Sequence, residues 1–400
     1  MISVKKIQIP EGTGFDRKVA MELANLISVA YNEYEVWDSN EELQHENELP
    51  PVITGSQDFA DLEMDSIECH KQNGENRNTD FEKLNPFWAT SKTYTRCANF
   101  FFPQWWWLEA LEPDNLPNLL EVDIQNFWNK LKDIVTTDQI FGFIAQSQKN
   151  PNQLFVVFRG TREGAEWFNN FRPKPKTFLP NDFSDLGDVR NGFNLIYTID
   201  RPKNPLLEFL KNLPLFSKFF ANQNTISSKE VVSNFFSKYF LDKEKSSNSE
   251  IFITGHSLGA GLATLAALHI AKLAERHKVN PSIKLYTFAS PRVGDETFAG
   301  HFDDFEKIKS YRIINSEDLI QAVPFPTTEV VDAATERGMS VSAKMRLDGI
   351  KQFLDKFTQG QAKKHYQHVG LSVTFTQQTG KIAGNHNLTD TYRRALFNDI

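Results

Sequence analysis

A buried strand, a tight turn and a helix follow one another near the middle of the chain. The strand and turn read Ile251-Phe252-Ile253-Thr254-Gly255-His256-Ser257-Leu258-Gly259, and small residues open the helical stretch 260–268 that comes next. A sharp strand-to-helix turn strains the backbone at its tip, and glycines two positions on either side leave room for the turn and for close helix packing. This context predicts that Ser257 is a nucleophile, and it disfavours the simpler interpretation in which Ser257 only caps a helix.

Strands and helical stretches alternate regularly after residue 138. Strands are expected at 140–146, 154–158, 251–254, 284–289, 310–314 and 371–376, and helices at 258–275 and 390–397. An earlier helix should begin after Asp16, where apolar residues keep a helical period. This alternation predicts an α/β architecture with a mostly parallel central sheet.

Composition excludes several classes of protein. The 400 residues carry a net charge of −7, which argues against a nucleic-acid partner because such a partner calls for a basic face. The two cysteines, Cys69 and Cys97, have neither metal nor redox spacing. No apolar run is long enough to span a membrane, and the start of the chain lacks the features of a Sec-type signal peptide. We therefore expect a cytoplasmic protein, or one exported without such a signal.

Several segments, in this order along the chain, resemble the class 3 lipases, the group that includes the secreted fungal triacylglycerol lipases. The resemblance covers roughly residues 138–398 and the helix near 16–36. It is carried by 156–161 with Trp167, by 188–193 with Arg190 in place of the usual histidine, by 255–259 and by 286–294. It implies an α/β-hydrolase fold and hydrolysis of carboxylic esters in lipids through an acyl-serine intermediate.

On this basis we expect two parts and several inserts. Residues 1–137 should form an N-terminal helix with a polar and aromatic extension packed on the core, and 138–400 the lipase core with helical inserts near 203–249 and 326–360. The aromatic run 100–107 is interpreted as a cap on the core rather than a lipid-facing patch. Three segments could form a lid over the active site, residues 162–180, 203–225 and 326–360.

Two groups are expected to hold the oxyanion that forms during acyl transfer. One is the backbone N–H of Leu258, the residue after the nucleophile. The other is Thr161, just beyond the strand 154–158, and the resemblance assigns the same role to this position. The alternative for Thr161 is an ordinary helix cap.

The acid and the base should follow the serine in the order Ser, Asp, His. Asp318 is preferred over Asp295 as the acid because it matches the N-x-x-D segment that the lipases carry before a proline. Three histidines follow Asp318. His386, in a loop before the last helix, is preferred as the base over His365 and His368, which run directly into a strand.

The predicted function is hydrolysis of lipid esters by a triacylglycerol lipase or carboxylesterase, with no metal and no organic cofactor. A phospholipase or galactolipase is the alternative among enzymes, because head-group selection depends on the inserts. A catalytically silent lipase-like binding or signalling protein is the alternative of another class. The expected partner is a lipid ester, with transient contact to a lipid interface; the sequence does not indicate an oligomeric state.

Overall fold

The computed structural model describes residues 4–9, 12–39, 94–103, 138–161, 175–198, 226–240, 248–304, 306–318, 366–380 and 382–397. The predicted lid segments 203–225 and 326–360 lie outside these residues, as do Trp105, Trp106 and Trp107 of the aromatic run. Of the first lid candidate, 162–180, only residues 175–180 are described.

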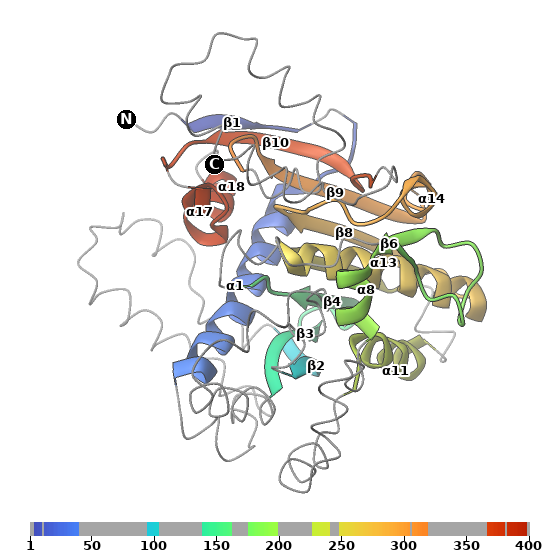
Figure 1. The fold of residues 1–400 in the computed structure, drawn as a ribbon. Coiled ribbons are helices and arrows are strands. Elements are labelled where there is room, and N and C mark those ends of the chain that lie inside the picture. Colours follow the sequence, from blue (N-terminus) through green and yellow to red (C-terminus); the bar gives the residue numbers. More distant parts are fainter. Residues whose placement is uncertain are drawn as a thin grey trace, which may run out of the picture.

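An eight-stranded sheet forms the centre of the molecule (Figure 1), in the order β1-β10-β9-β8-β7-β4-β3-β2. Five neighbouring strands are parallel to one another, namely β4 (Gln153–Phe158), β7 (Glu250–His256), β8 (Ser282–Phe288), β9 (Ile308–Asn315) and β10 (Leu371–Gln377). Antiparallel strands close both sides, β1 (Val4–Gln8) at one and β3 (Asp138–Ser147) with β2 (Tyr94–Pro103) at the other. The mostly parallel α/β architecture predicted from the sequence is confirmed.

One face of the sheet is covered by α13 (Leu258–His277), which packs on β4, β7 and β8. Against α13 lie α8 (Asn191–Thr198) and α11 (Ser228–Phe240). A large apolar cluster fills this interface, with Leu262, Leu265 and Phe236 among its members. The helix α13 is long and apolar enough to cross a membrane by length and composition, but 89% of its apolar stretch is buried inside the molecule, so its apolarity is explained by the core.

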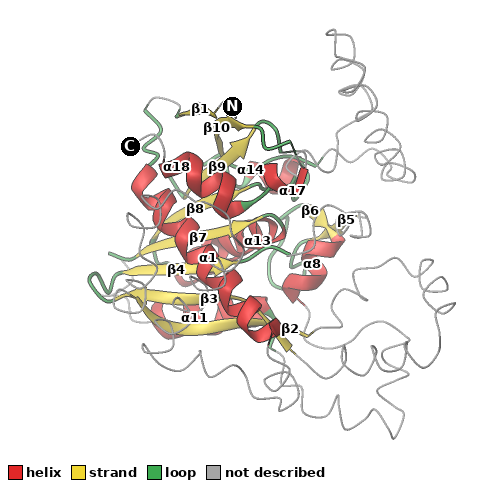
Figure 2. Ribbon diagram, turned by 90° about the vertical axis from the view of Figure 1, so that its left-hand side faces the viewer, coloured by secondary structure: helices red, strands yellow, loops and turns green. Residues whose placement is uncertain are grey.

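The other face carries α1 (Arg17–Ser39) together with elements near the end of the chain (Figure 2). Asp16 caps α1 as predicted, because its side chain accepts hydrogen bonds from the backbone N–H groups of Lys18 and Val19. Beside α1 lie the π-helix η6 (Leu388–Arg393) and α18 (Arg394–Phe397), and α17 (Ile382–Asn385) leads into them. Residues nearly 400 positions apart therefore share one layer, and Arg17 Nε donates to the carbonyl of Leu396 at 2.7 Å.

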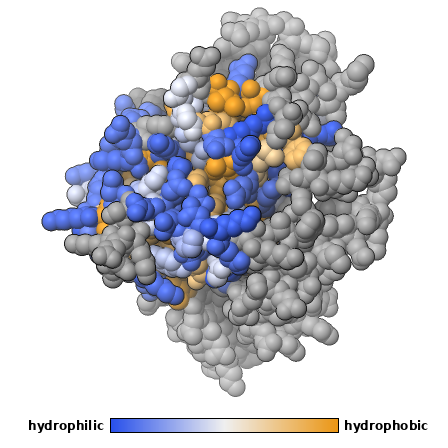
Figure 3. Space-filling view, turned by 180° about the vertical axis from the view of Figure 1, so that it is seen from behind, coloured by the Kyte–Doolittle hydropathy of each residue, from blue (hydrophilic) through white to orange (hydrophobic). Residues whose placement is uncertain are grey.

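Smaller elements complete the described fold. A two-stranded sheet of β5 (Pro175–Thr177) and β6 (Asp188–Arg190) leads into α8, and α14 (Glu296–Gly300) follows β8. Seen from behind (Figure 3), the described surface is mostly hydrophilic, with hydrophobic residues gathered in a smaller area.

Three details add to the sequence-based expectations. Residues 100–103, interpreted as the start of a cap, belong to β2 and continue the sheet. Part of the segment expected to be a helical insert, 203–249, is α11, which packs on α13 as a regular layer of the core. Cys97 of β2 is a free thiol.

Candidate active site

The turn between β7 and α13 holds Ser257 in a strained conformation. Its φ of 58° and ψ of −122° lie outside the regions that a residue with a Cβ normally adopts. The glycines of the motif make this turn feasible, because a Cβ on Gly255 would collide with the carbonyl of Gly259, and a Cβ on Gly259 would collide with that of Arg159. The segment therefore forms the elbow that the sequence predicts.

The structure brings Ser257, His386 and Asp318 together. The Oγ atom of Ser257 lies 2.7 Å from Nε2 of His386, and Nδ1 of His386 lies 2.8 Å from Oδ2 of Asp318. The Asp318 side chain has no exposed surface, whereas the His386 side chain keeps 14%. A carboxylate at Nδ1 favours the imidazole tautomer that leaves Nε2 free to accept the serine proton.

Asp318 sits in a turn directly after β9. Its backbone N–H donates to the carbonyl of Asn315 at 3.0 Å, and its Oδ2 accepts a second hydrogen bond, 2.6 Å long, from the hydroxyl of Tyr392. Burial, together with the nearby Asp318 carboxylate, raises the pKa of Tyr392 well above its usual value. Tyr392 therefore stays protonated and acts as a donor to the carboxylate.

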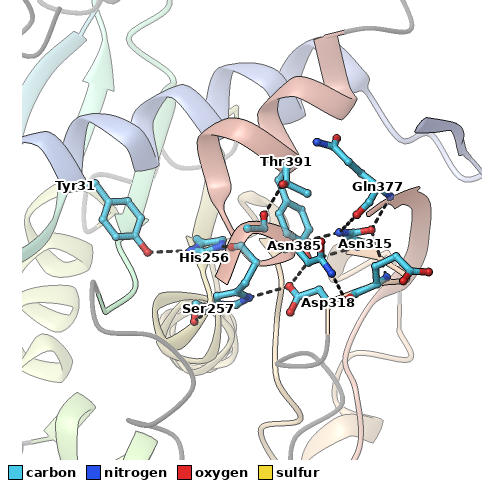
Figure 4. Close-up of polar contacts among 12 residues, drawn as sticks. Tyr31, His256, Ser257, Asn315, Asp318, Gln377, Asn385 and Thr391 are labelled. Atoms are coloured by element: carbon cyan, nitrogen blue, oxygen red, sulfur yellow. Dashed lines mark hydrogen bonds and ion pairs between the residues drawn. The ribbon is translucent and has the colours of Figure 1, made fainter. Parts of the chain in front are cut away.

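The loop that carries His386 is held by amide side chains (Figure 4). Asn385 donates to the carbonyl of Glu317 at 3.0 Å and accepts hydrogen bonds from the backbone and side chain of Thr379. Its own carbonyl accepts from the side chain of Asn315, which also bonds the backbone of Gln377 in both directions. The acid, the base and the end of β10 are thus tied into one network.

The competing candidates lie elsewhere. Asp295 caps α14, where it accepts a hydrogen bond from the backbone N–H of Phe298 at 2.9 Å. His368 is packed near Arg312 and Arg292; burial and these two cations lower its pKa to about 2. His365 lies outside the described residues.

His256, inside the elbow motif, does not contact the serine hydroxyl as a base would. Its two ring nitrogens contact the hydroxyl of Tyr31 and the carbonyl of His386. His256 therefore supports the site rather than acting as its base.

The two groups expected to hold an oxyanion lie next to the nucleophile. Leu258 is the first residue of α13, so its N–H is among those that a helix leaves without an intrahelical acceptor. Thr161 follows Gly160, which approaches the elbow so closely that a Cβ there would lie 3.0 Å from Ser257 Cβ. Their role as donors remains a prediction.

Tyr31, Tyr392, Asn385 and Gln377 take part in this site although the sequence does not predict that they do. The sequence identifies Asn315 only as the first residue of the N-x-x-D segment. A search for polar residues just after predicted strands could have found Gln377 at the end of β10, but Tyr31 and Tyr392 are single tyrosines in helical stretches and carry no local signal.

In the segment 188–193, which resembles a segment of the class 3 lipases, Arg190 stands where a histidine is usual. The residue is fully buried at the end of β6, and burial lowers its pKa to about 10. Its guanidinium lies 5.7 Å from the ring centre of Phe193. The position thus serves packing between β6 and α8.

The sequence also matches known proteins. The family model "Lipase (class 3)" matches residues 155–328. Phospholipase A1-IIalpha of Arabidopsis thaliana is 25% identical over 258 residues, which cover 62% of this chain and 54% of that protein. Phospholipase A1-II 4 of Oryza sativa subsp. japonica is 30% identical over 174 residues, which cover 42% and 39%. The chain spans about two-fifths to just over half of the length of such relatives.

Solved structures give similar matches. The M37 lipase shares 17% identity with a TM-score of 0.41, covering 66% of this chain and 77% of that one. The triacylglyceride lipase of Rhizomucor miehei shares 23% identity with a TM-score of 0.31, covering 46% and 55%. The match to the class 3 lipases thus covers the segment that contains Ser257 and Asp318, and this segment lies in a mostly parallel sheet with a strand-to-helix elbow, as in an α/β-hydrolase fold.

Proposed function

We propose that this protein hydrolyses carboxylic ester bonds of lipids, with Ser257 as the nucleophile, His386 as the base and Asp318 as the acid. One observation carries the proposal: a strained serine lies 2.7 Å from an imidazole nitrogen whose other nitrogen lies 2.8 Å from a buried carboxylate. This arrangement converts a weakly reactive hydroxyl into a nucleophile.

In the first half of the reaction, Ser257 Oγ attacks the ester carbonyl while its proton passes to Nε2 of His386. Asp318 stabilises the resulting imidazolium through Nδ1. Negative charge that develops on the carbonyl oxygen is held by the N–H of Leu258, at the positive end of the α13 dipole, and by Thr161. Collapse of the intermediate releases the alcohol, which takes the proton from His386.

In the second half, water replaces the alcohol. His386 removes a proton from the water, which attacks the acyl-serine ester through the same oxyanion site. The fatty acid leaves and Ser257 recovers its proton. His386 thus acts as base toward Ser257 in the first half and toward water in the second.

Two classes of lipid are candidates as substrates. The resemblance to the triacylglycerol lipases supports neutral glycerides or simple carboxylic esters, whereas several relatives that match this chain are named phospholipase A1. The name phospholipase A1 supports a polar lipid as the substrate, cleaved at its first acyl position. Both classes require the same chemistry at Ser257, so the choice rests on the groups that surround the leaving alcohol.

The first experiment measures hydrolysis of p-nitrophenyl butyrate and p-nitrophenyl palmitate by the wild type and by Ser257→Ala. The matched control is Ser233→Ala. Ser233 Oγ also lies near an imidazole, 3.5 Å from Nε2 of His269, but this histidine is several turns along α13 from the elbow. We expect loss of hydrolysis in Ser257→Ala only. Absence of wild-type hydrolysis above the Ser257→Ala background would favour a silent binding or signalling protein.

A second experiment separates the substrate classes. Purified enzyme is given triolein, phosphatidylcholine with different acyl chains at its two positions, and a galactosyl diacylglycerol, and the released fatty acids are identified. Release from triolein alone supports a triacylglycerol lipase, and release of only the first acyl chain of the phospholipid supports a phospholipase A1. Rates measured across the solubility limit of a long-chain ester test for a lid, because a lid predicts a sharp rise above that limit.

A further inference from the structure

Three segments that are far apart in the sequence meet around the imidazole of His256. The Tyr31 hydroxyl, on α1, lies 2.9 Å from His256 Nδ1 and accepts a hydrogen bond of 2.9 Å from the backbone N–H of Gly160. On its other side, His256 Nε2 lies 2.9 Å from the backbone carbonyl of His386. Figure 4 shows Tyr31 reaching from its helix toward His256 next to Ser257.

The direction of each hydrogen bond in this chain follows from its ends. A carbonyl oxygen can only accept, so Nε2 of His256 carries the hydrogen and donates to His386. Burial, and to a lesser extent the neighbouring His386, lower the pKa of His256 well below its usual value, so the ring is neutral. Nδ1 is therefore an acceptor, and the Tyr31 hydroxyl donates to it while accepting from Gly160.

We propose that Tyr31 and His256 are positioning residues that hold the end of β4 and the His386 loop in a fixed relation on either side of the nucleophile. This inference rests on the proposed function. The chain of hydrogen bonds runs from Gly160, which precedes the predicted oxyanion residue Thr161, to the backbone of the base itself. An N-terminal helix thereby contributes to catalysis through a single hydroxyl.

The geometry leaves little room for movement at this point. A Cβ on Gly160 would overlap the Tyr31 hydroxyl and would lie 2.7 Å from the His256 carbonyl. The rings of His256 and His386 are only 4.8 Å apart. A neutral His256 lets His386 take up the serine proton without a like charge beside it.

The chain contains a second tyrosine–histidine pair that serves as a matched control. The hydroxyl of Tyr197, on α8, lies 2.9 Å from Nδ1 of His269, the same distance as in the Tyr31–His256 pair. Both residues of this second pair are buried, and His269 lies twelve residues beyond Ser257, along α13. Loss of the Tyr197 hydroxyl removes its hydrogen bond to His269, and loss of the Tyr31 hydroxyl removes its hydrogen bonds to His256 and Gly160, but only the Tyr31–His256 pair adjoins the proposed site.

The experiment compares Tyr31→Phe with Tyr197→Phe. We measure kcat and KM for p-nitrophenyl butyrate, and the rate at which an alkyl p-nitrophenyl phosphonate labels Ser257, followed by p-nitrophenol release and mass spectrometry. In Tyr31→Phe we expect kcat and the labelling rate to fall by about tenfold with KM changed by less than about twofold. In Tyr197→Phe both rates should stay within about twofold of the wild type, even where thermal stability falls as much as in Tyr31→Phe.

A second pair of variants tests His256. His256→Leu removes both hydrogen bonds, and we expect kcat to fall by about a hundredfold because the loop and the strand lose their common support. His256→Gln keeps one donor and one acceptor, and we expect it to recover at least about a tenth of wild-type kcat. Equal kcat in the two variants would contradict the positioning role.

The outcomes also separate this inference from the proposed function. Equal losses in Tyr31→Phe and Tyr197→Phe, or no loss in Tyr31→Phe, would overturn the positioning role while hydrolysis by the wild type still supports the function. A wild type that is labelled at Ser257 but hydrolyses no ester would overturn the function and leave positioning supported where Tyr31→Phe slows labelling. A wild type that is not labelled would overturn both.

Discussion

Tyr392 donates a hydrogen bond of 2.6 Å to Oδ2 of Asp318, the same oxygen that lies 2.8 Å from Nδ1 of His386. The hydroxyl therefore competes with the imidazole for the charge of the carboxylate. In Tyr392→Phe the carboxylate loses this donor and stabilises the imidazolium form of His386 more strongly. We predict that the acidic limb of the kcat/KM profile moves to higher pH, by up to about one unit, and that activity at pH 6 falls.

Tyr286→Phe is the control for that prediction. Tyr286 belongs to the same apolar cluster as Tyr392, but its hydroxyl accepts a hydrogen bond from the backbone of Asp16 rather than from the site. Its pH profile should match that of the wild type. If the acidic limb of the kcat/KM profile did not move in Tyr392→Phe, or moved equally in both variants, the hydroxyl of Tyr392 would not act on Asp318.

The backbone strain at Ser257 predicts an unusual effect of glycine. The φ of 58° and ψ of −122° cost free energy for any residue with a Cβ, and glycine adopts them freely. Although both variants lack the nucleophile, Ser257→Gly should be more stable than Ser257→Ala by about 1 kcal/mol. Thermal unfolding of the two proteins measures the difference, and a less stable glycine variant would contradict the strain.

Close contact at Gly259 predicts that the elbow tolerates no added methyl group. Gly259→Ala would push α13 away from the carbonyl of Arg159 at the end of β4. We expect a loss of kcat of about a hundredfold, because displacement of the nucleophile by even 1 Å has effects of this size.

Gly300→Ala is the matched control for Gly259→Ala. Among the described residues, a Cβ at Gly300 would meet only the Asp303 carboxylate, at 3.9 Å, so both kcat and stability should be unchanged. If Gly259→Ala kept more than about a third of wild-type kcat, the helix would have to be free to move at its first turn.

A buried histidine away from the site predicts a loss of stability in acid. Burial is the main cause that lowers the pKa of His269, to about 3, so the folded protein keeps the ring neutral while the unfolded chain protonates it near pH 6.5. Its contribution is complete above pH 6.5 and is lost as the pH falls toward 3. Within this pH range, protonation of such a histidine in the unfolded chain lowers the free energy of unfolding by about 1.4 kcal/mol for each unit by which the pH falls.

Urea unfolding at pH 7, 6 and 5 checks the effect. The free energy of unfolding of His269→Gln should fall less steeply than that of the wild type, by about 1 kcal/mol per pH unit between pH 6 and 5. Parallel slopes for the two proteins would mean that His269 is protonated in the folded state.

The parallel strands and the elbow could be predicted because their signals are local. The inner strands β4 and β7 contain apolar runs, and Ser257 stands between glycines in a strand-to-helix context. The meeting of Ser257, His386 and Asp318 followed from the order of motifs along the chain. The geometry that joins them could not be read from the sequence.

Other elements depend on distant partners. The strand β2 lacks a clear alternation because its register against β3 shifts between Arg96 and Ala98, and Arg96 pairs with Glu33 of α1. Tyr31 reads as one more residue on a helix, since its partners Gly160 and His256 lie 129 and 225 positions away. Such roles are set by tertiary packing, which residue spacing does not encode.

The layer that α1 forms with the last helical segments also bears on the timing of biosynthesis. Once β7 and α13 have left the ribosome, Ser257 has been made. The imidazole of His386, however, belongs to a loop held by β10, by Asn385 and by η6, which are all made later. A nascent chain shorter than residue 386 therefore lacks the proposed base. Any esterase activity should therefore begin abruptly once His386 and the elements that hold its loop have been made, rather than grow with the length of the chain.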